Sequence, residues 1–170
     1  MQRPLPAGQG AHRREGPTAD VSTMAFSIRT ADWRRDREAL MDIRFAVFVE
    51  EQHVDPNIEL DDWDPQSHHA LGCAEDGTAI GTGRLLPDGH IGRLAVLPAW
   101  RGQGVGTALM RWLIALGRAH GHTRLELSAQ THALAFYERL GFTAEGDVYM
   151  EAGIPHRHMF LNVSELPASD

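Results

Sequence analysis

Cysteine is almost absent from this sequence, and basic residues and long apolar runs are also scarce. The single Cys73 has no partner for an internal disulfide, so we expect a reducing compartment, the cytoplasm. Sixteen Lys and Arg residues stand against 23 Asp and Glu residues, and this formal net charge of -7 argues against a general nucleic-acid-binding protein. No apolar stretch approaches the roughly 20 residues that cross a membrane, and the N-terminus has no apolar core of a secretory signal. We therefore expect neither a membrane nor a nucleic acid as partner.

The composition is that of an ordinary globular domain. The 170 residues are 42% hydrophobic and 23% charged, which is enough to bury a core without disulfides. Residues 1–23 are rich in Gly, Pro, Arg, Gln and Thr and show no apolar period, so we expect a disordered tail there. No internal repeat is visible, and residues 24–170 are expected to form a single domain.

Apolar periodicity predicts a mixed sheet with helices packed against it. Alternation and short apolar runs indicate strands over 26–29, 69–74, 80–86, 91–97, 123–129, 148–151 and 158–163. Helical spacing indicates a helix after the N-cap Asp32 and two more over 107–120 and 131–140, whereas 54–66 reads as a loop or broken helix. The expected inward face of 107–120 carries Ala108, Leu109, Trp112, Leu113, Leu116 and Ala119. Strands in a meander followed by alternating helices and strands are typical of the α/β (α+β) class.

A glycine-rich segment lies between the predicted strand 91–97 and the predicted helix 107–120. It reads Arg101-Gly102-Gln103-Gly104-Val105-Gly106. Backbone N–H groups at a helix start have no intrahelical partners, and the helix dipole adds partial positive charge there. Glycines lack the Cβ atoms that would keep a phosphate away from the chain. The segment therefore predicts a pyrophosphate site.

Two motifs in this order resemble the GNAT superfamily of acyl-CoA N-acyltransferases. The segment 101–106 is similar to that family's pyrophosphate loop, R/Q-x-x-G-x-G/A. Residues 136–142 are similar to the end of its second helix, F-Y-x-x-x-G-F, with one helix and one strand between the motifs, as in the family. The resemblance covers about residues 26–162. It implies a mostly antiparallel central sheet flanked by helices, with a V-shaped splay between the strands near 91–97 and 123–129.

A narrower resemblance is to the ElaA/YjcF-like branch of that superfamily. It rests on residues 44–52 followed by Glu59, Asp61, Asp64 and His69, and on Gly153-Ile154-Pro155-His156 with Met159 near the end. The same early segment is similar, more distantly, to the acyl-homoserine-lactone synthases, which share a version of this fold.

The resemblance implies acetyl-CoA as co-substrate. The implied cofactor-binding residues are Leu94, Ala95, Val96, Arg101, Gly102, Gln103, Gly104, Val105, Gly106, Thr107, Gln130, Phe136 and Tyr137. A backbone N–H near Val96 would stabilise the oxyanion, and Tyr137 would protonate the leaving thiolate. The alternative for Tyr137 is that it only packs its helix on the sheet. Gln130 stands where many members carry Asn, and its extra methylene changes the geometry of that contact.

The sequence offers several candidates for the residue that accepts the amine proton. They are Glu59, Asp61, Asp64, His68, His69, His156 and His158. The branch pattern favours Glu51 or Glu59 as a catalytic residue, although a solvated loop accounts better for any single acid and a water chain would replace a dedicated base. The residues expected at the acceptor are Glu51, Glu59, His69 and His156. His156 and His158 face one way on a strand, but no ligand spacing is convincing and no metal is expected.

Together these inferences predict a GNAT-type N-acetyltransferase. It would transfer an acetyl group from acetyl-CoA to a primary amine of a small molecule by direct attack in a ternary complex. Two alternatives stay open: an enzyme of the same fold with another acyl donor, as in the acyl-homoserine-lactone synthases, and a non-catalytic acyl-CoA-binding module. A homodimer is the usual outcome for such domains. No motif identifies the acceptor amine.

Overall fold

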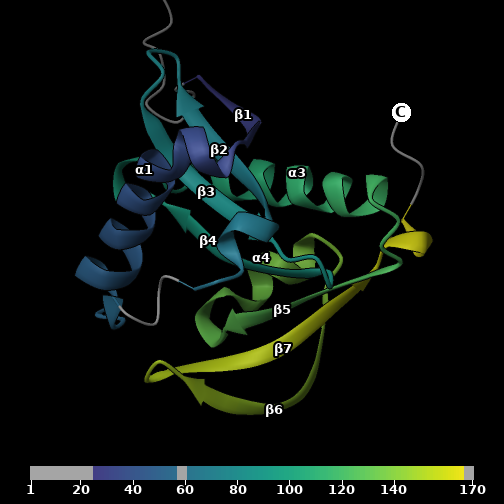
Figure 1. Ribbon diagram of the computed structural model, residues 1–170. Helices are drawn as coiled ribbons and strands as arrows, with labels where there is room; N and C mark the ends of the chain where they lie inside the picture. Colours follow the sequence, from purple (N-terminus) through teal and green to yellow (C-terminus); the bar gives the residue numbers. More distant parts are fainter. Residues whose placement is uncertain (1–24, 57–60, 167–170) are drawn as a thin grey trace, which may run out of the picture.

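The computed structural model describes residues 25–56 and 61–166, which form one seven-stranded sheet with helices on both faces (Figure 1). The strands are β1 (Phe26–Ala31), β2 (His68–Ala74), β3 (Ala79–Leu85), β4 (His90–Val96), β5 (Arg124–Gln130), β6 (Thr143–Glu151) and β7 (Ile154–Asn162). The α-helices are α1 (Trp33–Arg44), α3 (Val105–Ala119) and α4 (Leu134–Arg139). A π-helical segment, Phe45–Glu51, continues α1, and short 3₁₀ turns cover Asp64–Gln66, Pro98–Trp100, Thr131–Ala133 and Val163–Glu165. None of the helices in these ranges is long and apolar enough to cross a membrane.

The sheet divides at its one parallel junction. Its strand order is β1-β2-β3-β4-β5-β7-β6, and every neighbouring pair except β4 and β5 is antiparallel. The parallel pairing of β4 with β5 covers only His90 opposite Glu126 and Ile91 opposite Leu127. Beyond these pairs the two strands diverge, as Figure 1 shows. The predicted mostly antiparallel sheet, flanked by helices and splayed at this junction, is confirmed.

Two separate cores cover the two faces of the sheet. Side chains that alternate along β2 belong to different cores, since Ala70 packs with α3 and Leu71 packs with α1. Glycines in β3 let α3 approach closely: a Cβ at Gly83 would lie 2.7 Å from the Leu113 Cδ1 atom. The helix α3 therefore packs directly on the middle of the sheet. The glycine-rich loop at its N-terminus lies next to the C-terminal end of β4.

The inward face of α3 differs from the predicted one. Its buried residues are Val105, Leu109, Met110, Leu113 and Gly117. Trp112 is 38% exposed, and its indole Nε1–H donates to Thr30 Oγ1 at 3.0 Å. The helix begins at Val105, two residues before the predicted start, and has apolar side chains on several sides. Leu109 and Leu113 are buried as predicted, whereas Trp112 and Ala119 are exposed, so periodicity alone identified only part of the inward face.

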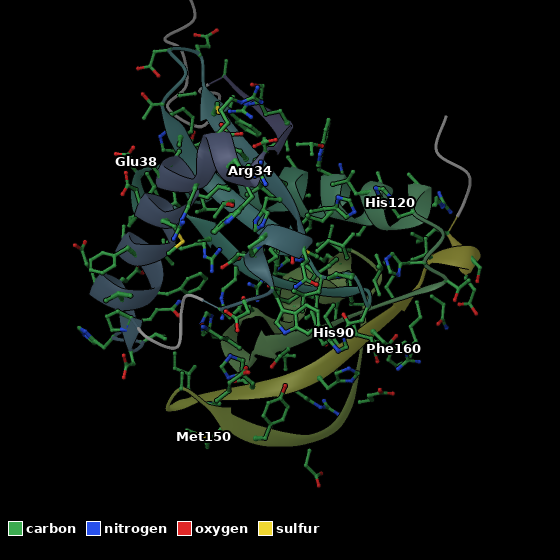
Figure 2. The ribbon with its side chains drawn as sticks, in the orientation of Figure 1. Arg34, Glu38, His90, His120, Met150 and Phe160 are labelled. Atoms are coloured by element: carbon green, nitrogen blue, oxygen red, sulfur yellow. The ribbon has the colours of Figure 1, made fainter. Side chains whose placement is uncertain are left out.

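The C-terminal hairpin is longer than predicted. The strand β6 was expected over 148–151, but it pairs with β7 from Thr143 onwards through a register shift between Glu145 and Tyr149. It forms the outer edge of the sheet, where Met150 is 65% exposed (Figure 2). Few apolar side chains of β6 are buried, which is why alternation revealed only part of the strand. The predicted N-cap is confirmed, since Asp32 Oδ1 accepts from the Arg35 N–H at 2.9 Å.

Candidate functional site

A cavity of about 1020 Å³ lies where β4 and β5 separate. Its wall is formed by β4, the glycine-rich loop, the first turn of α3, β5, α4, the hairpin β6–β7 and the π-helical segment. Twelve of the predicted cofactor residues line it: Leu94, Ala95, Val96, Arg101, Gly102, Gly104, Val105, Gly106, Thr107, Gln130, Phe136 and Tyr137. Gln103 does not, because its side chain turns back and donates to the Ala99 carbonyl at 3.1 Å. The size suits a small-molecule site.

The glycine-rich loop presents the start of α3 to this cavity. Gly104 is the N-cap residue and has φ +86°, a left-handed conformation that other residues adopt at a cost. No side chain caps the helix, so the first-turn N–H groups keep the partial positive charge of a helix start. A Cβ at Gly106 would lie 3.4 Å from the Phe136 ring. These features fit a bound phosphate group at the loop.

Arg101 joins the loop to the segment after α1. Its two Nη atoms donate to Glu51 Oε1 and Oε2, each at 2.6 Å, and its Nε donates to the Val96 carbonyl at 3.0 Å. The hydrogen bonds from Arg101 lower the pKa of Glu51 below its usual value. A carboxylate held in this way is a weaker proton acceptor, so the contact argues against the prediction that Glu51 is the general base.

Tyr137 lies on the face of the sheet that carries α3 and α4. Its ring contacts Phe136 and Phe142, with centroids 4.9 and 6.1 Å away, and it packs against the core beneath α3. Burial raises the pKa of Tyr137 to about 12, so the phenol keeps its proton at neutral pH. Tyr137 thus packs the helix and also presents a protonated hydroxyl group in the cavity wall.

His156 reaches the same cavity from the opposite face of the sheet. Along β7, Met159 and Leu161 point into the core under α3, so His156 points the other way. Its Nδ1–H donates to the Ile154 carbonyl at 2.7 Å, since a carbonyl oxygen can only accept. The Nε2 atom lies 3.5 Å from Glu151 Oε2, on a side chain that also lines the cavity. A nitrogen that can accept a proton therefore lies in the wall opposite Tyr137.

The Gln130 amide is held by two neighbours in the cavity wall. Its Nε2 donates to Gln52 Oε1 at 2.8 Å, and His132 Nε2 donates to its Oε1 at 2.6 Å. The contact between Gln130 and a cofactor stays a prediction. Ser128, two residues earlier on β5, also lines the cavity, with its hydroxyl donating to Glu151 Oε2 at 3.0 Å. The sequence did not identify Ser128 and Glu151 as site residues, although both lie on strands that it predicts.

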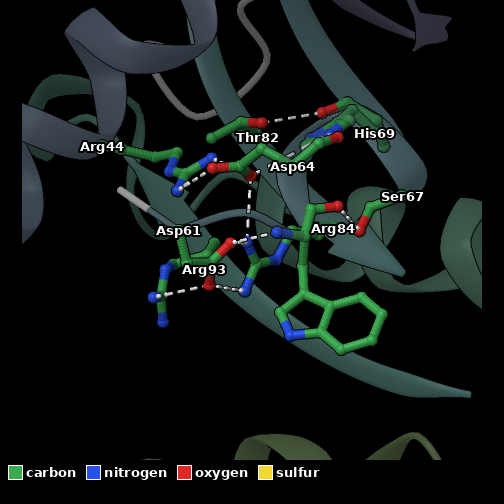
Figure 3. Close-up of polar contacts among 10 residues, drawn as sticks. Arg44, Asp61, Asp64, Ser67, His69, Thr82, Arg84 and Arg93 are labelled. Atoms are coloured by element: carbon green, nitrogen blue, oxygen red, sulfur yellow. Dashed lines mark hydrogen bonds and ion pairs between the residues drawn. The ribbon is translucent and has the colours of Figure 1, made fainter. Parts of the chain in front are cut away.

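Three of the candidate proton acceptors, Asp61, Asp64 and His69, belong instead to a largely buried polar cluster (Figure 3). Asp64 is fully buried and accepts from Arg44 Nη1 at 2.7 Å and from Arg84 Nη1 at 2.9 Å. Asp61 accepts from Arg84 at 2.7 Å and also meets the Arg93 guanidinium at 3.4 Å. The His69 ring Nε2 donates to the Asp64 carbonyl at 2.8 Å.

His69 is therefore a structural residue, which corrects its expected place at the acceptor. It is 1% exposed, stacks on Trp33 with ring centroids 4.9 Å apart, and is not in the cavity wall. Burial lowers the pKa of His69, which keeps the ring neutral. His68 stacks on His120 away from the cavity. Glu59 lies outside the residues that the structure describes, so its predicted role stays a prediction.

Known proteins are similar to this chain in both fold and sequence. The model of the acetyltransferase (GNAT) family matches residues 37–142. The uncharacterized N-acetyltransferase YjcF of Bacillus subtilis is 34% identical over 133 residues, which cover 74% of this chain and 94% of YjcF. An acyl-CoA N-acyltransferase from Pseudomonas aeruginosa is 36% identical with a TM-score of 0.71, covering 81% of this chain and 99% of that chain. For Escherichia coli ElaA the identity is 30% and the TM-score 0.72, covering 81% of this chain and all of ElaA.

The family match spans both motifs of the cavity wall, the loop at 101–106 and the helix end at 136–142. The early segment at 44–52 also lies within the family match, and the relatives cover 74–81% of the chain. The chain therefore belongs to the acetyltransferase (GNAT) family and is an ElaA/YjcF-like member of it.

Proposed function

We propose that this protein transfers an acetyl group from acetyl-CoA to a primary amine of a small molecule, by direct attack in a ternary complex. The observation that carries the proposal is the cavity between β4 and β5, which joins the glycine-rich loop to Tyr137 and His156. These two side chains approach it from opposite faces of the sheet. In this arrangement, the thioester would enter the cavity from one face of the sheet and the amine from the other.

The residues present fit acetyl-CoA as a bound co-substrate. The uncapped start of α3 offers N–H groups to the pyrophosphate. The strand β4 pairs with β3 on one edge and leaves β5 after Ile91, so residues 94–96 have an edge along which a pantetheine amide chain would bind. A backbone N–H of that edge, near Val96, would then stabilise the oxyanion.

The bound thioester supplies an activated carbonyl carbon, to which the amine forms a C–N bond as the C–S bond breaks. His156 Nε2 would accept the proton that the attacking nitrogen loses. Tyr137 would donate its phenolic proton to the departing thiolate sulfur. Cys73, the single cysteine, lies in β2 and outside the cavity wall, which favours direct transfer over a cysteine-bound intermediate.

Release of free CoA tests this function. With acetyl-CoA and a panel of small amines, we expect thiol release that depends on a primary amine and is absent with the matching alcohols. Initial rates measured against both substrates should give intersecting lines, and parallel lines would contradict direct attack. Longer acyl-CoAs and an acylated carrier protein, used as competing donors, test the choice of donor. Tight CoA binding without release by any amine would indicate a binding module instead.

Replacing His156 by glutamine should lower kcat/KM by roughly 100-fold near neutral pH. An effect of this size is typical for the loss of a general base. The loss should shrink at alkaline pH, where bulk solvent deprotonates the amine. The measurement is the pH profile of kcat/KM, with melting temperature and CoA affinity recorded to exclude misfolding. His68→Gln, which changes a histidine outside the cavity wall, is the control. An unchanged pH profile for His156→Gln would remove His156 from the mechanism.

A further inference from the structure

Three potential metal ligands meet at the closed end of the splay, apart from the proposed acyl-transfer residues. They are His90 on β4, Glu126 on β5 and His158 on β7, and one ligand atom from each lies within 4.8 Å of the others. His90 is paired with Glu126 in the parallel ladder, and Glu126 is opposite Phe160, two residues from His158. Figure 2 shows His90 and Phe160 on these neighbouring strands. The register of three strands thus brings the ligands together.

The distances among these atoms match those of a metal site. His158 Nε2 lies 3.3 Å from Glu126 Oε1, and His90 Nε2 lies 3.6 Å from Glu126 Oε2. Ligand atoms about 2.0–2.1 Å from a tetrahedral zinc ion are roughly 3.3 Å from one another. The side chains are 43%, 28% and 30% exposed, so an ion can reach them from solvent. Little movement would be needed to bind it.

A carboxylate also faces the other nitrogen of each imidazole. Glu145 Oε1 lies 2.9 Å from His158 Nδ1, and Asp88 Oδ1 lies 3.0 Å from His90 Nδ1, although too poorly aligned for a hydrogen bond. At His158 such a carboxylate can hold the proton on Nδ1 and direct the Nε2 lone pair at a metal.

The local charge also favours a divalent cation. The carboxylates of Asp88, Glu126 and Glu145 surround the two rings. Arg124 offsets one charge, since it lies 3.3 Å from Glu126 Oε1 and 2.9 Å from Glu145 Oε1. A net negative charge of about two then remains when both imidazoles are neutral. Two imidazole nitrogens with one carboxylate select Zn²⁺ and its transition-metal neighbours over Mg²⁺ or Ca²⁺.

We propose that His90, Glu126 and His158 bind a divalent transition-metal ion such as Zn²⁺. The ion links β4, β5 and β7 where the splay closes, and three protein ligands leave a position for water. The sequence predicts no metal because the histidines close in the chain, His68 with His69 and His156 with His158, have no convincing ligand spacing. The ligands observed here are separated by more than thirty residues each, so no local spacing reveals them.

Zinc titration of the full chain tests the proposal. After treatment with a chelator and removal of any affinity tag, calorimetry should show one Zn²⁺ per chain and no uptake of Mg²⁺. Co²⁺ should give the visible absorption of a tetrahedral site, and Zn²⁺ should raise the melting temperature. The double variant His90→Gln/His158→Gln should lose binding by 100-fold or more. Glu145→Gln, which removes the charge that faces His158 and Arg124 but no proposed ligand, should weaken it by about 10-fold.

The matched control is His120→Gln. His120 lies at the C-terminal end of α3 (Figure 2) and stacks on His68, so it belongs to a different histidine pair. This variant should bind Zn²⁺ as the unaltered chain does. Equal binding by the double variant, or loss of binding in the control, would overturn the assignment. So would the absence of Zn²⁺ uptake and of the Co²⁺ spectrum in the unaltered chain. None of these readouts depends on acetyl transfer.

Discussion

Replacing Tyr137 by phenylalanine is expected to lower kcat by about 100-fold or more and to leave CoA affinity nearly unchanged. The ring contacts with Phe136 and Phe142 survive in the variant, so the helix α4 should keep its place. What is lost is a hydroxyl group that stays protonated, because burial raises the pKa of Tyr137 to about 12. The thiolate would then have to take its proton from water.

The measurement combines steady-state rates of CoA release with calorimetric titration of CoA. Thr143→Val is the control, since it removes an exposed hydroxyl group on the edge strand β6, outside the cavity wall. It should change kcat much less. Because Tyr137 keeps its proton up to strongly alkaline pH, the unaltered enzyme should show no loss of rate from this group below about pH 11. A Tyr137→Phe variant within threefold of the unaltered rate would show that the phenol only packs.

Replacing Asp64 by asparagine is expected to reduce the free energy of unfolding by about 3–5 kcal/mol. Asp64 is fully buried between the guanidinium groups of Arg44 and Arg84. Removing its charge leaves these two cations close together in the core, with Asp61 as the remaining partner of Arg84. Urea unfolding at neutral pH measures the loss. Asp76→Asn, at an exposed turn, is the control and should cost far less.

The loss of stability caused by Asp64→Asn should depend on pH. Burial alone would raise the pKa of Asp64, but hydrogen bonds and charges from Arg44 and Arg84 outweigh it and lower the pKa below its usual value. A carboxyl group whose pKa is lower in the folded state stabilises the fold above its unfolded pKa, and this contribution is lost as pH falls through the folded pKa. The difference between the unaltered chain and Asp64→Asn should therefore shrink below about pH 4. A difference that stays constant in acid would mean that the ion pairs contribute little.

The sequence by itself determined the elements and the family. Glycines at 102, 104 and 106, placed between an apolar strand and an amphipathic helix, predicted the loop that the structure presents to the cavity. Alternation and apolar runs located all seven strands, β6 only in part, and Asp32 predicted the start of α1. These features are local, because backbone hydrogen bonds within a helix and the alternation of side chains along a strand depend on neighbours in the chain.

Only the tertiary structure decided which side chains meet. Glu51 and Arg101 are fifty residues apart and form an ion pair at the cavity, which argues against Glu51 as the base. His69 and Asp64 are candidate proton acceptors in the sequence but are buried beside Arg44. Packing and strand register also decide which face of α3 is buried. They place Tyr137 and His156 on opposite faces of the sheet and bring His90 close to Glu126 and His158. Such contacts depend on how distant segments close on one another, and no local period encodes that.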